Sequence, residues 1–121
     1  GLLQAVGTVG PPTAPAIYVV LSGERAERAG LALAERLRDA LPGAGVVANM
    51  DGGSFKAQLK RADRSGAELA VILGDDEAAR GTAAVKWLRT EAPQQEWPWD
   101  ELPRRLAAAL GREVTTGRND G

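Results

Sequence analysis

Three short apolar runs alternate with segments of helical periodicity, and this alternation limits the chain to a small set of folds. The runs are residues 17–21 (IYVVL), 46–50 (VVANM) and 69–73 (LAVIL). Runs this short and this apolar are typical of strands that are buried on both faces. Between them, apolar residues recur every three or four positions, which predicts helices over residues 24–41 and 54–65. The pattern therefore predicts a largely parallel sheet with helices on both faces.

The part of the chain after residue 73 departs from this alternation. We expect a short helix up to Gly81, strands over residues 82–89 and 94–97, and a last helix from Asp100. Because two strands follow one another without a full helix between them, one edge of the sheet should be mixed. The fold class is therefore α/β, with three layers and a mixed, mostly parallel sheet of about five strands. We expect the domain over residues 16–113, an uncharged linker over 1–15 and a flexible tail over 114–121.

Several local features of the helices are also predicted. We expect Ser22, Ser54 and Asp100 to cap the first, second and last of the long helices, because short polar side chains accept hydrogen bonds from free backbone amides. The inner face of the second helix should be formed by Phe55, Leu59 and Ala62.

The composition excludes several kinds of chemistry. The 121 residues include no cysteine and no histidine, which excludes thiol catalysis, an imidazole base and the common zinc sites. We therefore assign no catalytic residue and no metal ligand. The formal net charge of −1 points to no particular partner. No apolar run approaches the roughly 18 residues of a membrane span, so we expect no membrane partner and a cytoplasmic location.

The second predicted helix carries a row of cations. Lys56, Lys60 and Arg64 follow one another at four-residue spacing and share one face, with Arg61 beside them. The preceding Gly52–Gly53 turn lets a ligand backbone approach the positive end of the helix. These features suit a phosphate or an RNA backbone. The alternative is an ordinary solvated face of an amphipathic helix.

Acidic, basic and aromatic residues in the second half have alternatives of their own. Asp75, Asp76 and Glu77 follow a buried strand; they could bind magnesium or, as we favour for the two aspartates, stabilise a helix N-terminus. Glu77 could also accept a hydrogen bond from a base edge. Lys86 could guard an edge strand or contact RNA. The tryptophans could stack on bases, although packing is the more common role: Trp87, Trp97 and Trp99.

Residues 52–77, GGSFKAQLKRADRSGAELAVILGDDE, resemble the C-terminal anticodon-binding domain of the histidyl-tRNA synthetase family, a class IIa family of aminoacyl-tRNA synthetases. The resemblance extends upstream through APAIYVV and downstream through GTAAVKWLR, and covers residues 15–111. The run ADRSGA favours the histidyl family over the threonyl, prolyl and glycyl families. Glu96 departs from the family pattern, which more often has a neutral residue there.

The resemblance implies a module that binds the anticodon end of histidine tRNA. The parent would be a homodimeric ligase that joins histidine to tRNA with ATP and magnesium, in a catalytic domain missing from this sequence. This fragment would then bind RNA without catalysis and without a cofactor of its own. The rival interpretations are a protein-interaction or dimer-packing domain, and a metal-dependent enzyme or nucleotide sensor. The implied anticodon contacts are Glu77, Lys86, Gly52, Gly53, Ser54, Lys56 and Gln58, and the RNA backbone contacts are Lys60, Arg61 and Arg64.

Overall fold

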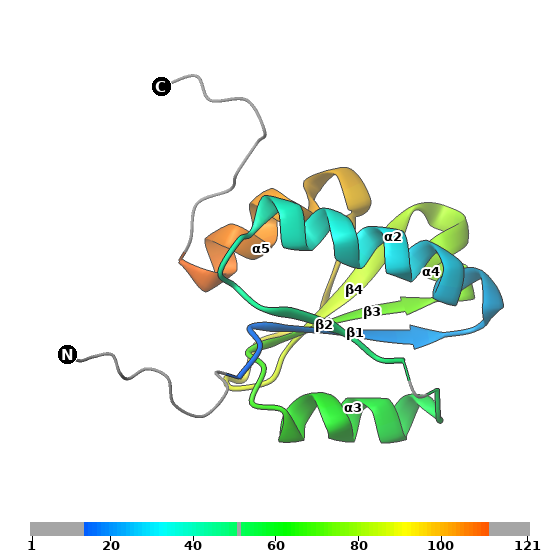
Figure 1. Cartoon of the computed structure of the whole chain (residues 1–121), viewed down its shortest axis with the longest axis horizontal. Coiled ribbons are helices and arrows are strands. Elements are labelled where there is room, and N and C mark those ends of the chain that lie inside the picture. The colour runs from blue at the N-terminus through cyan, green and yellow to red at the C-terminus, as the bar shows by residue number, and fades with distance from the viewer. Residues whose placement is uncertain (1–13, 51, 112–121) are drawn as a thin grey trace.

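The computed structural model describes residues 14–50 and 52–111 (Figure 1). In this part of the chain, strands and helices alternate as far as the third strand, and two strands and a C-terminal helix follow. The expected linker and tail lie almost wholly outside the described residues. The elements in chain order are β1 (Ile17–Ser22), α2 (Glu24–Ala40), β2 (Val46–Ala48), α3 (Phe55–Arg64), β3 (Leu69–Gly74), α4 (Asp75–Arg80), β4 (Thr82–Trp87), β5 (Gln95–Pro98), the 3-10 turn η1 (Trp99–Glu101) and α5 (Leu102–Leu110).

The described strands form one five-stranded sheet in the order β2-β1-β3-β4-β5. Strand β1 is parallel to both of its neighbours, whereas β4 is antiparallel to β3 and to β5. The mixed α/β sheet expected from the sequence is confirmed. Strands β4 and β5 have no helix between them, and β3 and β4 are joined by the six-residue helix α4; both connections are shorter than the crossover that a parallel neighbour needs.

The two faces of the sheet are covered unequally. Helices α2, α4 and α5 lie on one face, and α3 lies alone on the other (Figure 1). Alternate residues of β1, such as Val19 and Val20, belong to two separate apolar clusters, one under α2 and α5 and one under α3. Helix α3 lies mainly over β1. Ala84 of β4 is still buried in the α3 cluster, whereas Lys86 and Glu96, further out on the same face of β4 and β5, are exposed.

The N-terminus of α2 is capped by a residue from another helix. Its N-cap residue is Gly23, and the expected cap by Ser22 is wrong. Instead, Asp75 Oδ1 accepts a hydrogen bond from the Ala26 amide at 3.0 Å. The carboxylate approaches so closely that a Cβ atom on Gly23 would lie 2.4 Å from Asp75 Oδ1. Gly23 has φ +111°, and glycine therefore meets both the steric and the backbone requirement at this turn.

The other predicted local features have mixed outcomes. Ser54 caps α3 as expected, because its Oγ accepts from the Ala57 amide at 3.1 Å. The expected cap by Asp100 is wrong: Asp100 lies within η1, and α5 starts after Glu101 without a side-chain cap. The expected inner position of Phe55 is also wrong, since Phe55 is 45% exposed while Gln58 is buried. No helix among the described residues is both long and apolar enough to cross a membrane.

Candidate nucleic-acid interface

The loop between β2 and α3 is held in place by Asn49 and Arg61. The buried Asn49 side chain accepts hydrogen bonds from the Tyr18 hydroxyl (2.8 Å) and from Arg61 (3.0 Å). Its amide nitrogen donates to the Gly52 carbonyl at 3.0 Å, and Arg61 donates to the same carbonyl at 2.7 Å. Ser54 is exposed at the start of α3. The Gly52–Gly53–Ser54 segment therefore enters α3 in a defined conformation.

Gln58 lies beneath this loop and not on its surface. It is 1% exposed, and its Nε2 donates to the carbonyls of Leu21 (2.7 Å) and Gly53 (3.0 Å). Its Oε1 accepts from the Leu21 amide at 2.9 Å. The amide is thus occupied by backbone groups of β1 and the loop. A direct base contact by Gln58 does not fit this geometry, and its part is to hold the loop from inside.

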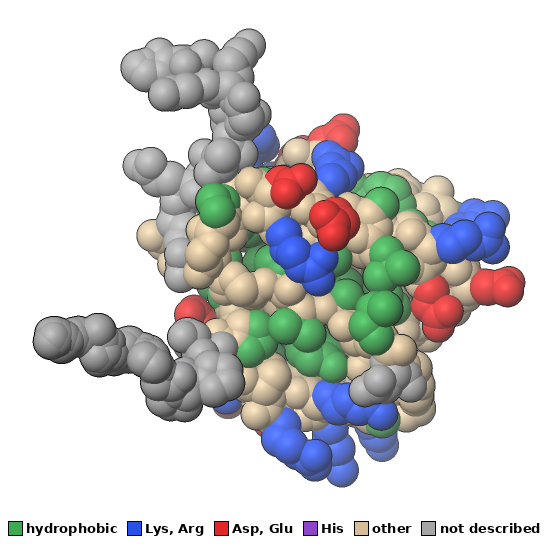
Figure 2. Space-filling view, in the orientation of Figure 1, with side chains coloured by type: hydrophobic (Ala, Val, Ile, Leu, Met, Phe, Trp, Pro, Cys, Tyr) green, Lys and Arg blue, Asp and Glu red, His purple; other side chains and the backbone are tan. Residues whose placement is uncertain are grey.

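The cations of α3 differ in their surroundings. Lys56, Lys60 and Arg64 are exposed and have no ion pair among the described residues. Arg61 is half-buried on the loop. The acid of this helix, Asp63, is paired with Arg89. Lys and Arg side chains gather on the α3 side of the molecule (Figure 2). The outer face of α3 is therefore a positively charged row with no acidic partner of its own.

Glu77 and Lys86 lie at two different points of the surface. Glu77 Oε1 accepts from the Gly74 amide at 2.9 Å, and its Oε2 lies 3.7 Å from the Arg80 guanidinium. Lys86 is exposed and pairs with Ala70, four residues from Gly74 along β3, a separation of about 13 Å. Strand β4 is not the edge strand, so the edge-guard interpretation of Lys86 does not apply. A ligand that touches both residues must be extended, as a single strand of RNA is.

Two of the three carboxylates at the start of α4 cap helices. Asp75 caps α2, Glu77 caps α4 through Gly74, and Asp76 is exposed. The described residues contain no group of three or more acidic, cysteine or histidine side chains placed to hold a metal ion. The metal-dependent alternative therefore has no ligand set in the described part of the chain.

An ionic network at β4 and β5 was not foreseen from the sequence. Arg80 Nε contacts Glu96 Oε2 at 3.0 Å, and the Thr82 hydroxyl donates to the same oxygen at 2.6 Å. The Thr82 hydrogen bond, followed by that of Arg80, lowers the pKa of Glu96, and the hydrogen bond with Glu96 raises the pKa of Arg80. The sequence signal was Glu96 itself, the one departure from the family pattern in this region.

The tryptophans pack against the sheet on the side opposite α3. Trp87 and Trp97 form an edge-to-face pair with ring centroids 5.8 Å apart, and Arg105 lies over Trp97. Trp99 Nε1 donates to the Thr82 carbonyl at 2.7 Å. All three pack against the larger apolar cluster, which confirms packing as their role.

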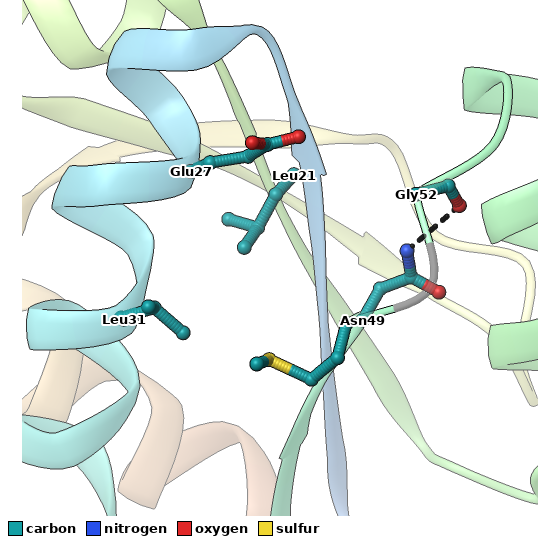
Figure 3. A pocket seen from close by; sticks show the side chains of 6 residues that line it. Leu21, Glu27, Leu31, Asn49 and Gly52 are labelled. Atoms are coloured by element: carbon teal, nitrogen blue, oxygen red, sulfur yellow. Dashed lines mark hydrogen bonds between the residues drawn. The ribbon is translucent and has the colours of Figure 1, made fainter.

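A cavity of about 350 Å³ opens near the carboxyl ends of β1 and β2, between α2 and the β2–α3 loop. Leu21 and Leu31 lie on one side of it and the Asn49–Gly52 hydrogen bond on the other (Figure 3). Met50, 71% exposed, adds a third apolar side chain, and Glu27 and Asn49 contribute polar groups to the lining. Of the residues expected to contact RNA, only Gly52 lines this cavity. The cavity and the charged row are therefore separate surfaces of the described chain.

The chain is similar in sequence to known proteins. The sequence profile of a family described as an anticodon binding domain matches residues 16–109. The chain is 51% identical over 110 residues to the histidine–tRNA ligase of Halorhodospira halophila, covering 91% of this chain and 26% of that protein. It is 46% identical over 96 residues to the enzyme of Hydrogenovibrio crunogenus, covering 79% and 22%.

Among solved structures, the chain is similar to histidyl-tRNA synthetase from a Nostoc species, with a TM-score of 0.73 and 29% identity. This match covers 83% of the present chain and 23% of that one. The chain thus spans about a quarter of the length of the curated relatives that it matches.

Proposed function

This chain belongs to the anticodon-binding domain family, in the form found in histidine–tRNA ligases, and from that premise we propose that it binds the anticodon end of histidine tRNA. The observation that carries the proposal is the row of exposed cations on α3, which have no ion pair among the described residues and lie on the same side of the sheet as the exposed Lys86 and Glu96. Splayed single-stranded bases can lie on such a face while their phosphates follow the cations.

The described residues divide between the two tasks. Glu77 can accept a hydrogen bond from a base amino group, and Lys86 can donate to a base oxygen or nitrogen. Gly52, Gly53, Ser54 and Lys56 present the loop and the N-terminus of α3, which Gln58 supports from below. Lys60 and Arg64 contact the RNA backbone, with Arg61 at the edge of the same row.

The relatives, of which this chain spans about a quarter, support a proposal about the whole protein. We propose that the parent is a cytoplasmic, homodimeric histidine–tRNA ligase that uses ATP and magnesium in a separate catalytic domain. This chain would position the tRNA for that domain, its partner within the same polypeptide.

A second candidate function, docking to another protein surface, rests on one observation. Leu31, Val47 and Met50 are exposed near the cavity, and hydrophobic side chains gather between α2 and α3 (Figure 2). Apolar surface of this kind is common at protein interfaces. This surface is separate from the cationic row. Substitutions in the apolar surface should therefore affect protein docking, and substitutions in the cationic row should affect RNA binding.

Titration with an anticodon stem-loop tests the proposed function. The chain is titrated with the stem-loop of histidine tRNA and with a scrambled-anticodon stem-loop, each at two salt concentrations. We expect tighter binding of the cognate loop at both concentrations, because base contacts add a term that salt does not remove. Equal, fully salt-dependent binding of both loops would leave only a basic helix and would contradict the proposal.

A further inference from the structure

We propose that Arg80 and Glu96 are positioning residues for Glu77, and that this pair sets how strongly the domain discriminates between anticodon bases. The inference rests on the proposed function, because it assigns a role to Glu77 in base reading. It adds two residues to which the family resemblance assigned no contact with RNA.

The three charged side chains form a continuous chain of contacts between two elements, α4 and β5. Arg80 Nε lies 3.0 Å from Glu96 Oε2, and Arg80 also approaches Glu77 Oε2 at 3.7 Å. Thr82 fixes the far end of the chain by donating to Glu96. Glu77 and Arg80 belong to the short helix α4, whereas Glu96 lies on β5. The network therefore connects the end of α4 to the outer strand of the sheet.

The two carboxylates depend on the arginine between them. The long Arg80 side chain, on a helix of six residues, has many rotamers. Its contact with Glu96 selects the rotamers in which the guanidinium also reaches Glu77. Without the positive charge of Arg80, Glu77 and Glu96 would have no cation between them, and like charges disfavour one another. Glu96 thus acts on Glu77 through Arg80.

The Glu77 carboxylate has one oxygen committed to the fold and one available. Its Oε1 accepts from the Gly74 amide, and its Oε2 has only the longer contact with Arg80 among the described residues. The side chain is 23% exposed, so a base amino group can reach the second oxygen. A carboxylate that is already oriented loses less rotamer freedom when it binds, and it selects more sharply between a donor and an acceptor on the base.

The register of the sheet places Glu96, the β5 end of this network, on the same sheet face as Lys86. Glu96 pairs with Ala84, which belongs to the apolar cluster under α3, and Lys86 lies two residues further along the same face of β4. Glu96, Thr82 and Lys86 therefore share the α3 face of the sheet, around the buried Ala84.

The test is a double-mutant cycle. The quantity compared is discrimination, the affinity for the cognate stem-loop divided by the affinity for a loop with one anticodon base replaced. Binding is measured for the cognate stem-loop and for loops with each anticodon base replaced in turn. Glu77→Gln first identifies the base whose discrimination depends on Glu77. Arg80→Gln, Glu96→Gln and Glu77→Gln combined with Arg80→Gln are then compared at that base. Arg38→Gln is the matched control, since Arg38 is similarly exposed and is paired with Glu35 on α2. Thermal unfolding of every variant monitors the fold.

We expect Glu77→Gln to lower discrimination at that base by about tenfold. Arg80→Gln should lower it by about threefold or more, Glu96→Gln by a smaller factor, and Arg38→Gln not at all. In the Glu77→Gln background, Arg80→Gln should have no further effect on the ratio, because its effect passes through Glu77.

Three other outcomes would overturn the inference, and they differ from a failure of the proposed function. If Arg80→Gln weakens all loops by the same factor in both backgrounds, Arg80 contacts phosphate instead. If Arg80→Gln leaves discrimination unchanged, or if Glu77→Gln affects no base, the positioning role is absent. If the unaltered chain fails to prefer the cognate loop, the proposed function itself fails.

Discussion

At the scale of single residues, the close approach of Gly23 and Asp75 ties together two distant parts of the chain. The Asp75 carboxylate lies where a side chain at position 23 would be, and it satisfies an amide at the start of α2. An N-terminal cap of this kind stabilises a helix by about 0.5–2 kcal/mol. The contact therefore joins the turn after β1 to the turn after β3.

Gly23→Ala should destabilise the domain by about 3 kcal/mol, because the new Cβ clashes with Asp75 and the positive φ is strained. Denaturant unfolding provides the free energy. Gly81→Ala is the control, since Gly81 also has a positive φ (+72°) but nothing lies within 4 Å of the added Cβ. Its free energy of unfolding should fall by about 1 kcal/mol. Equal losses in the two variants would show that the approach of Asp75 is unimportant.

Gln58→Leu should destabilise the domain by about 2–4 kcal/mol, because the buried amide and carbonyl of Leu21 lose their partner. Gln94→Leu, at an exposed position, should change the free energy of unfolding by less than about 0.5 kcal/mol. A loss at Gln58 no larger than that at Gln94 would contradict the bonding described here.

These residues also show the limit of prediction from the sequence. The Ser54 cap was predicted because the cap and the amide it binds are three residues apart. The cap on α2 was not, because its acceptor is 49 residues away. Periodicity placed Phe55 inside and treated Gln58 as a surface residue. Hydropathy patterns record apolar side chains, whereas Gln58 is buried by hydrogen bonds to the backbone of another strand.

At the scale of elements, α3 presents one face to the sheet and a charged row to solvent. Its buried residues are Gln58 and Ala62, and Lys56, Lys60 and Arg64 lie outward. The positions of the helices and strands were predicted to within a few residues, since each has a distinct apolar pattern. The Arg80–Glu96 pair was not, because it depends on the register of β4 against β5.

Lys60→Ala should weaken binding of every stem-loop by a similar factor and lower the salt slope by about one unit, because one phosphate contact is lost. Plots of affinity against salt concentration measure both effects. Arg36→Ala, which removes an exposed cation of α2, is the control and should leave the slope unchanged. A loss confined to the cognate loop would assign Lys60 to base reading.

At the scale of the whole molecule, the 121 residues include neither histidine nor cysteine, so no side chain has an ordinary pKa near 7. The pKa of Glu96 is lowered in the folded chain from its ordinary 4.5. Protons therefore bind this group more readily in the unfolded chain, so its contribution to stability is complete above pH 4.5 and is lost as the pH falls through the lowered value.

The free energy of unfolding should vary by less than about 0.5 kcal/mol between pH 6 and 7.5, and should then fall toward pH 3. Urea unfolding over this range measures it. In Glu96→Gln the fall below pH 4.5 should be shallower than in the unaltered chain. An identical acid dependence in the two proteins would show that the contacts of Glu96 with Thr82 and Arg80 do not persist in solution.

The unequal covering of the sheet has a consequence for how a sequence of this kind can vary. Along β4, Ala83, Ala84 and Val85 are buried core residues, whereas Thr82 is partly exposed and Lys86 is exposed. Saturation mutagenesis of β4 should therefore separate two sets of positions, a buried set that governs expression level and an exposed set that governs which RNA is retained. The exposed positions can change one residue at a time during evolution while the buried positions are conserved. New RNA recognition can therefore arise without loss of the fold.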